Sequence, residues 1–108
     1  MSPRLHQLAE ARSLALHREV ARRVRADPGL LAPVKERVKR WLETREVASF
    51  YANAWWALLD GPPERLLATL ETQDEQADAL RQASPFLGIV DARRRWQIWR
   101  DVKSASSP

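Results

Sequence analysis

Proline and glycine divide this chain into short segments, and this punctuation constrains the fold more than any other feature. The interruptions fall at Pro28, at Gly61 with Pro62 and Pro63, and at Pro85. Proline lacks a backbone N–H and pushes the preceding residue out of the α region, so each site ends a helix. The segments between them are rich in Ala, Leu, Arg and Glu, which are good helix formers, and no strand-like alternation persists. The sequence therefore predicts an all-α fold, a compact single-domain bundle of roughly five to six helices.

The expected boundaries follow from these signals. We expect helices over residues 4–26, 47–60, 63–71, 74–83 and 92–103. A second helix begins either in the turn at Pro28 or at about Ala32, because Pro33 either kinks it or delays its start. Residues 84–90 are expected to cross the core as an extended apolar strap. The domain then spans residues 1–103, and residues 104–108 form a disordered tail.

Length and composition narrow the classes further. A chain of 108 residues is one domain, and no apolar run approaches the ~20 residues that a membrane span needs. The absence of cysteine excludes disulfides, thiolate metal sites and thiol nucleophiles. The N-terminus lacks the apolar stretch of a signal peptide, so we expect a cytoplasmic protein. The missing apolar run predicts no membrane partner. We also expect no cofactor.

Charge is unevenly distributed along the chain. Residues 1–45 carry 11 basic and 5 acidic residues, residues 46–90 carry 2 and 7, and residues 91–108 carry 5 and 2. Arginine supplies 15 of the 18 basic residues, and its planar guanidinium suits phosphate, carboxylate and aromatic faces. Such asymmetry favours a nucleic-acid or acidic protein partner, although codon bias also produces an arginine-rich chain.

Two helical faces are candidate binding surfaces. On a helical wheel Arg4, Arg18, Arg22 and Arg25 share one side of the first helix, away from Glu10 and Glu19. In the last helix Ile98, Trp99 and Val102 are expected to face the bundle, with three arginines pointing outward. A plain solvated face is the alternative for the stripe on the first helix. In the last helix, arginine interleaved with tryptophan fits nucleic-acid binding and a protein interface equally well. The predicted partner-binding residues are Arg18, Arg22, Arg25, Trp56, Arg93, Arg94 and Arg100.

The chain has five tryptophans, which is many for its length, and most of them are expected in the core. Trp55 lies on the apolar side of its helix and is predicted to be core. Trp56 points toward the polar side, where it either joins a protein interface or lies beneath the strap. His6 and His17 are eleven residues apart, about 16 Å along a helix, and cannot share a metal ion. We expect both to be partly exposed and expect no metal site.

Catalytic motifs are missing from the sequence. It contains no Gly-rich phosphate loop, no Gly-x-Ser-x-Gly elbow, no His-Glu-x-x-His and no Asp-rich metal loop. Its carboxylates are expected mainly on solvent-facing helical positions. We therefore expect no catalytic residues and no enzyme activity.

Three patterns together carry a family resemblance. They are Ser84-Pro85-Phe86-x-Gly88 followed by Arg95-Trp96-x-Ile98-Trp99-Arg100-x-Val102, the helix from His17 closed by Arg25-x-Asp27-Pro28, and Tyr51-Ala52-x-x-Trp55 followed by Leu58-Leu59. The chain resembles a family of small helical bacterial proteins encoded beside a nucleotidyltransferase-type toxin. The resemblance covers most of the chain and implies an antitoxin-like partner that binds and restrains the toxin.

Three functional hypotheses remain open at this point. The first is an antitoxin-like protein that neutralises a nucleotidyltransferase-type toxin by protein–protein contact. The second is a small basic nucleic-acid-binding regulator, although the rigid turn at Gly61-Pro62-Pro63 does not suit a helix-turn-helix. The third is a homo-oligomer that associates through exposed tryptophans. The first two are compatible, since one protein can bind both a toxin and its promoter.

Overall fold

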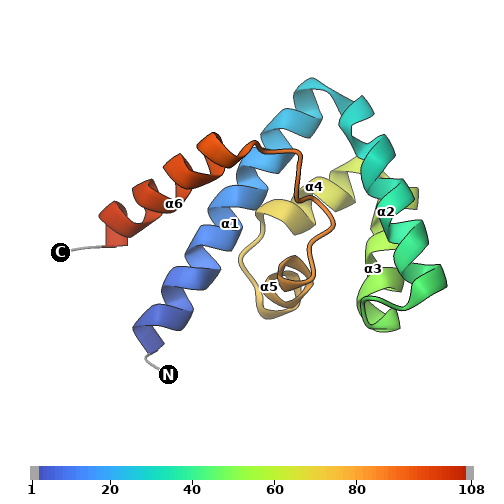
Figure 1. Ribbon diagram of the computed structural model, residues 1–108, viewed down its shortest axis with the longest axis horizontal. Helices are drawn as coiled ribbons and strands as arrows, with labels where there is room; N and C mark the ends of the chain where they lie inside the picture. Colours follow the sequence, from blue (N-terminus) through green and yellow to red (C-terminus); the bar gives the residue numbers. More distant parts are fainter. Residues whose placement is uncertain (1–2, 107–108) are drawn as a thin grey trace.

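The computed structural model describes residues 3–106, and every regular element in that range is helical (Figure 1). The predicted all-α, single-domain bundle is thereby confirmed. Residues 107–108 of the predicted tail, and the side chain of Arg4, lie outside the described part. The helices are α1 (Pro3–Ala26), α2 (Leu31–Thr44), α3 (Ser49–Asp60), α4 (Pro63–Glu71), α5 (Glu75–Gln82) and α6 (Ala92–Ser106), with a short 3-10 turn η1 (Pro28–Leu30) before α2.

The start of the second helix combines the two expected alternatives. Asp27 accepts a hydrogen bond from the Gly29 N–H at 3.1 Å and caps the 3-10 turn that contains Pro28. The α-helix itself begins at Leu31, so Pro33 falls in its first turn. Backbone N–H groups in a first turn have no partner within the helix, and proline is tolerated there without a kink.

The later helices follow the predicted boundaries until the C-terminus. Helix α4 matches residues 63–71, and Asp74 caps α5 by accepting from the Ala77 N–H at 2.7 Å. The last helix continues to Ser106, so the prediction that it ends at residue 103 is wrong. No glycine or proline interrupts residues 103–106, and Ala105 is a good helix former.

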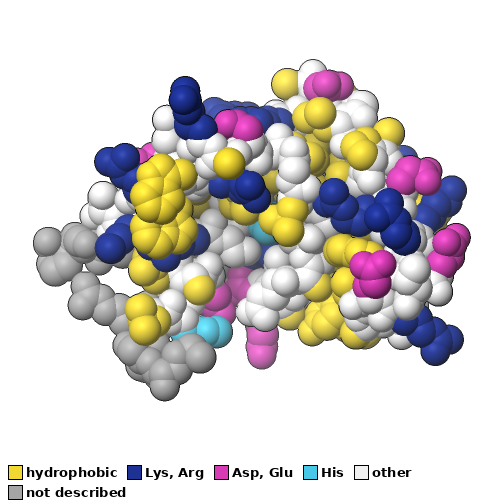
Figure 2. Space-filling model, viewed as in Figure 1, with side chains coloured by type: hydrophobic (Ala, Val, Ile, Leu, Met, Phe, Trp, Pro, Cys, Tyr) yellow, Lys and Arg dark blue, Asp and Glu magenta, His cyan; other side chains and the backbone are white. Residues whose placement is uncertain are grey.

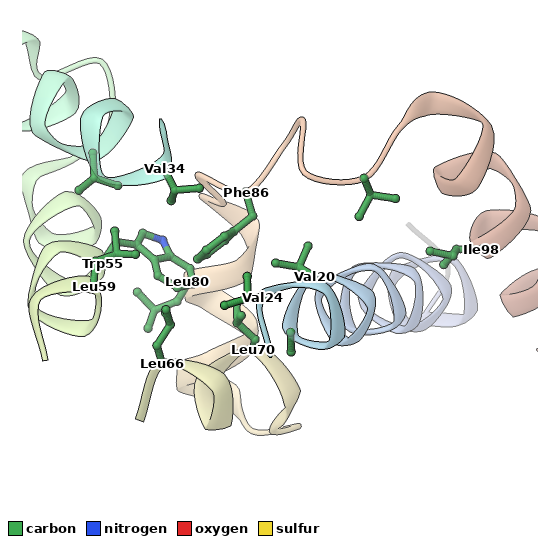
Figure 3. Packing of buried hydrophobic residues seen from close by; sticks show 13 residues of the cluster. Val20, Val24, Val34, Trp55, Leu59, Leu66, Leu70, Leu80, Phe86 and Ile98 are labelled. Carbon is green, nitrogen blue, oxygen red and sulfur yellow. The ribbon is translucent and has the colours of Figure 1, made fainter. Parts of the chain in front are cut away.

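Helix α1 separates two regions of packing. On one side lie the α2–α3 hairpin, α4 and α5, and on the other α6 runs beside α1 (Figure 1). Trp55, Leu66 and Leu70 pack with Phe86 in the larger region, whereas Ile98 of α6 lies apart on the far side of α1 (Figure 3). Because α6 is joined to the bundle only through α1 and the preceding loop, its outer side is left facing solvent.

The strap of residues 84–90 covers the core as predicted, but the prediction that it is extended is wrong, because the Ile89 N–H donates to the Phe86 carbonyl at 3.2 Å in a turn that places Gly88 at a φ of 106°. Phe86 and Val90 are buried, and the Phe86 ring meets the Trp55 ring edge-on with centroids 5.1 Å apart. Trp55 also joins α3 to the end of α5, because its indole N–H donates to the Ala83 carbonyl at 2.8 Å. Trp56 is half-buried against the core cluster, so it is not fully exposed on the polar side of its helix, and its place in a protein interface stays a prediction.

Backbone carbonyls of the strap are bound by arginines from two helices. Arg37 of α2 donates to the carbonyls of Pro85 (2.7 Å) and Leu87 (2.8 Å). Arg23 of α1 donates to the carbonyl of Ile89 at 3.0 Å. Buried carbonyls need such partners where there is no regular secondary structure. Part of the arginine richness is therefore structural.

Candidate partner-binding surface

A buried carboxylate fastens α6 to α1. Glu19 of α1 has an exposed fraction of only 6% and is bound by three arginines. Arg23 donates to it at 3.0 Å, Arg94 of α6 donates at 3.2 Å, and Arg22 forms a bidentate pair with it. We call Glu19, Arg22, Arg23 and Arg94 the Glu19 cluster.

Electrostatics keep this carboxylate ionised. The pKa of Glu19 is lowered from 4.5 to about 2, chiefly by the hydrogen bonds from Arg22; burial opposes this shift, and the bonds from Arg23 and Arg94 contribute to it. The same pairing raises the pKa of Arg22. Hydrogen bonds between ionised partners are the strong ones in proteins. The Glu19 cluster therefore fixes the position of α6 on the bundle.

The Glu19 cluster corrects three sequence predictions. Glu19 is not solvent-facing, and Arg94 turns inward to bind it instead of pointing outward. Arg22 remains exposed but is paired, and Arg25 is paired with Glu71 of α4. Among the predicted stripe on α1, only Arg18 is exposed without a recorded side-chain partner in the described part of the chain. Two of the four stripe residues, Arg22 and Arg25, are thus held in ion pairs, although the three arginines around the single Glu19 carboxylate leave the Glu19 cluster positively charged.

A stack of flat groups occupies the junction between α1 and α6. The rings of Trp96 and Trp99 are nearly parallel, with an interplanar angle of 11° and centroids 5.0 Å apart. The Arg12 guanidinium lies 3.5 Å from the centroid of Trp99. Both groups cannot fit on one face of the ring, so Trp99 is sandwiched between Arg12 and Trp96. Trp99 is thus half-covered, in partial agreement with its predicted inward position.

Trp96 is the outermost member of the stack, with an exposed fraction of 56%. The expectation that most tryptophans are core is wrong, because Trp55 alone is buried, while two of the other four, Trp96 and Trp99, are exposed. Arg93, Trp96, Arg100 and Lys103 are spaced by three, four and three residues, which places them along one side of a helix. Ile98 and Val102 face the opposite way, toward α1.

These features define one surface, which we call the α6 outer surface. Figure 2 shows stacked hydrophobic side chains exposed over α6 with dark blue Lys and Arg side chains around them. Its members are Arg93, Trp96, Trp99, Arg100 and Lys103. The side chains of Arg93 and Arg100 have no recorded ion pair or hydrogen bond within the described residues.

Part of this surface is predictable from the sequence. Arg93 and Arg100 were predicted to point outward, and the structure places both there. Trp96 was missed as a surface residue, although the spacing Arg93-x-x-Trp96-x-x-x-Arg100 carries the signal. Arg18, Arg22 and Arg25 lie along α1, and Trp56 lies on α3. Of the seven predicted residues, Arg22 and Arg94 meet at Glu19, and only Arg93 and Arg100 belong to the α6 outer surface.

His17 also departs from its prediction as a partly exposed histidine. Its exposed fraction is 2%, and it lies edge-on to Phe86 beneath the strap. Its Nδ1 is 2.7 Å from the Ser13 carbonyl and its Nε2 is 2.7 Å from the Ser84 hydroxyl. A carbonyl only accepts, so Nδ1–H donates and Nε2 accepts from Ser84 in the neutral ring. His6 is exposed and paired with Glu10 at 2.9 Å.

Burial makes His17 a source of pH-dependent stability. Desolvation lowers the pKa of His17 from 6.5 to about 4, the bond to Ser13 opposes this shift and the charge of Arg81 adds to it. At a pH between these two pKa values, His17 is protonated in the unfolded chain but neutral in the folded chain. We expect the free energy of unfolding to fall as pH drops from 6.5 toward 4.

Urea denaturation across this pH range tests the expectation. The His17→Gln variant, which cannot titrate there, should lose less stability than the wild type over the same interval. The His6→Gln variant is the matched control and should follow the wild type. Parallel curves for wild type and His17→Gln would contradict the assignment.

Residues 3–106 contain no group of three or more His, Asp or Glu positioned to hold a metal ion. None of their helices is both long and apolar enough to cross a membrane. In comparisons with known proteins, no family model, curated protein or solved structure matches the chain.

Proposed function

We propose that this chain is a non-catalytic, antitoxin-like binding protein that neutralises a nucleotidyltransferase-type toxin by docking the α6 outer surface on it. The observation that carries the proposal is the exposed Trp96 on a rigid stack, flanked by Arg93 and Arg100. Tryptophan and arginine are the residue types most enriched among the few that dominate protein–protein binding energy. The family resemblance supplies the class of partner.

Preorganisation supports this use of the surface. Trp99 is held between Arg12 and Trp96, and Arg94 ties the same helix to the Glu19 cluster. A surface whose side chains are already ordered loses less conformational entropy on binding than a flexible one. The α6 outer surface is therefore better prepared for docking than the paired arginines of α1.

Charge also matches the proposed partner. The α6 outer surface is basic, whereas residues 46–90, which build α3, α4 and α5, carry 7 acidic and 2 basic residues. A nucleotide-transferring cleft that binds metal and triphosphate combines an acidic floor with a basic rim. The basic α6 outer surface is complementary to the acidic floor of such a cleft, and such complementarity raises association rates and fixes orientation.

Growth rescue tests this function in cells. The chain is expressed together with the product of its neighbouring gene, in a host where that product alone slows growth. We expect the wild type to restore growth and the Trp96→Ala/Arg100→Ala variant to restore it less. Phe50→Ala, which removes an exposed aromatic ring from α3, is the matched control and should behave as wild type. Failure of the wild type to restore growth would contradict the proposal.

A further inference from the structure

The stack on α6 ends in an open aromatic face. The Arg12 guanidinium lies 3.5 Å from the centroid of Trp99, and the rings of Trp99 and Trp96 are stacked with centroids 5.0 Å apart. One face of Trp96 is covered by Trp99. Within the described residues no ring or guanidinium is recorded on its other face, and the side chain is 56% exposed. This exposed face is where one more flat group would extend the stack.

Cations surround this open position. Arg93 and Arg100 are one helical turn before and after Trp96, and Lys103 lies a turn further along, 5.7 Å from the centroid of Trp99. The only acidic residue of α6, Asp101, is about 140° away from Trp96 around the helix axis. The position therefore combines a π face with positive charge on both sides. A ligand that matches it has a flat ring covalently linked to anionic groups.

Nucleotides of a single strand have this combination. Aromatic side chains stack on the bases of single strands, while a positively charged surface follows the phosphates. Bases inside a duplex are already stacked on their neighbours and do not offer a free face to Trp96. An acidic peptide satisfies the cations but has no flat ring to extend the stack. The geometry therefore favours a single strand over both alternatives.

We propose that the open face of Trp96 is a stacking position for a base of single-stranded nucleic acid, whose phosphates are bound by Arg93 and Arg100. This proposal goes beyond the toxin-binding function and does not depend on it, because it concerns the chain alone. A strand and a protein partner would compete for Trp96.

The test is fluorescence anisotropy of a labelled, unstructured oligonucleotide of ~10 nucleotides, a length within the range that single-strand-binding folds cover. At low salt the wild type should bind, and Trp96→Ala should weaken binding by about 5- to 100-fold, which corresponds to the loss of one stacked base. Trp96→Phe should retain most of the affinity. Phe50→Ala, the aromatic control, should bind as tightly as the wild type.

Salt dependence tests the cations separately. The Arg93→Gln/Arg100→Gln variant should lower the slope of log affinity against log salt by up to ~1.4, since each phosphate contact contributes ~0.7 for single strands. Arg40→Gln, an exposed arginine on α2, is the charge control and should leave the slope unchanged. Parallel titrations with DNA and RNA oligonucleotides of the same sequence show which of the two kinds of single strand binds more tightly.

Several results would overturn the proposal. One is no binding of any single strand at low salt, which would leave the surface to a protein partner. Another is an equal loss of affinity in Trp96→Ala and Phe50→Ala, which would indicate non-specific attraction. A duplex that binds as tightly as the single strand would also contradict it, because stacking on Trp96 needs an unpaired base. Unchanged thermal unfolding of Trp96→Ala confirms that the variant is folded.

Discussion

Replacing Trp55 with alanine is expected to lower the free energy of unfolding by about 3–5 kcal/mol, the usual cost of removing a large buried aromatic side chain. Trp55 has an exposed fraction of 0% and packs edge-on against Phe86 of the strap. Its indole N–H also satisfies the Ala83 carbonyl at 2.8 Å. Truncation leaves both a cavity and an unpaired carbonyl where α5 meets the strap.

Urea denaturation of matched variants measures this effect. Trp55→Phe keeps much of the ring but removes the hydrogen bond, so it should lie between wild type and Trp55→Ala. The total stability of a domain this size is about 5–15 kcal/mol, so a loss of this size can unfold Trp55→Ala. In that case the free energy of unfolding of Trp55→Phe tests the prediction. Trp41→Ala removes a half-buried ring of α2 and is the control. An equal loss in Trp41→Ala and Trp55→Ala would contradict the central place of Trp55.

Replacing Glu19 with glutamine is expected to lower the free energy of unfolding by about 3 kcal/mol. Removing one partner of a buried ion pair costs about 3–5 kcal/mol, and the lower end applies because the three arginines left behind still reach water. The neutral side chain no longer attracts Arg94, so α6 should detach more often. Relative to the wild type, amide hydrogen exchange in the Glu19→Gln variant should accelerate more in α6 than in α3.

Acid titration gives Glu19 a second signature. The folded-state pKa is depressed to about 2 from 4.5, so its contribution to stability is full above pH 4.5 and is lost as pH falls toward 2. Glu19→Gln should lack this component. Glu10→Gln, on the same helix in an exposed pair with His6, should lose at most ~1 kcal/mol. Equal losses in the two variants would contradict the role of the Glu19 cluster.

The helices were predictable from the sequence because their boundaries depend on neighbouring residues. Pro28, Pro63 and Pro85 restrict the backbone wherever they occur, and Asp74 caps the helix that it directly precedes. The end of α6 was misplaced because residues 103–106 contain no comparable signal.

Partners distant in sequence explain most of the missed side chains. Glu19 is buried because Arg94, 75 residues later, reaches it, and His17 is buried because Ser84, 67 residues later, covers it. A helical wheel contains no information about such contacts. Trp96 was missed for a different reason, since composition favours burial of tryptophan while its spacing with Arg93 and Arg100 favours exposure.

The two roles of arginine were also indistinguishable in the sequence. Arg37 and Arg81 have structural roles: Arg37 binds strap carbonyls, and buried Arg81 binds the carbonyls of Thr69 and Thr72 and the carboxylate of Asp78. Arg93 and Arg100 remain available at the surface. The number of arginines therefore overstated the basic surface, and the tertiary contacts decide which of them can bind a partner.

Calorimetric titration of the purified toxin-type partner with this chain tests the central claim, that the α6 outer surface is the docking surface. We predict a stoichiometric complex with wild type and with Phe50→Ala. Trp96→Ala should bind at least about 30-fold more weakly, which corresponds to the ~2 kcal/mol typical of a dominant interface residue. No complex with wild type, or an affinity of Trp96→Ala equal to that of wild type, would contradict the claim.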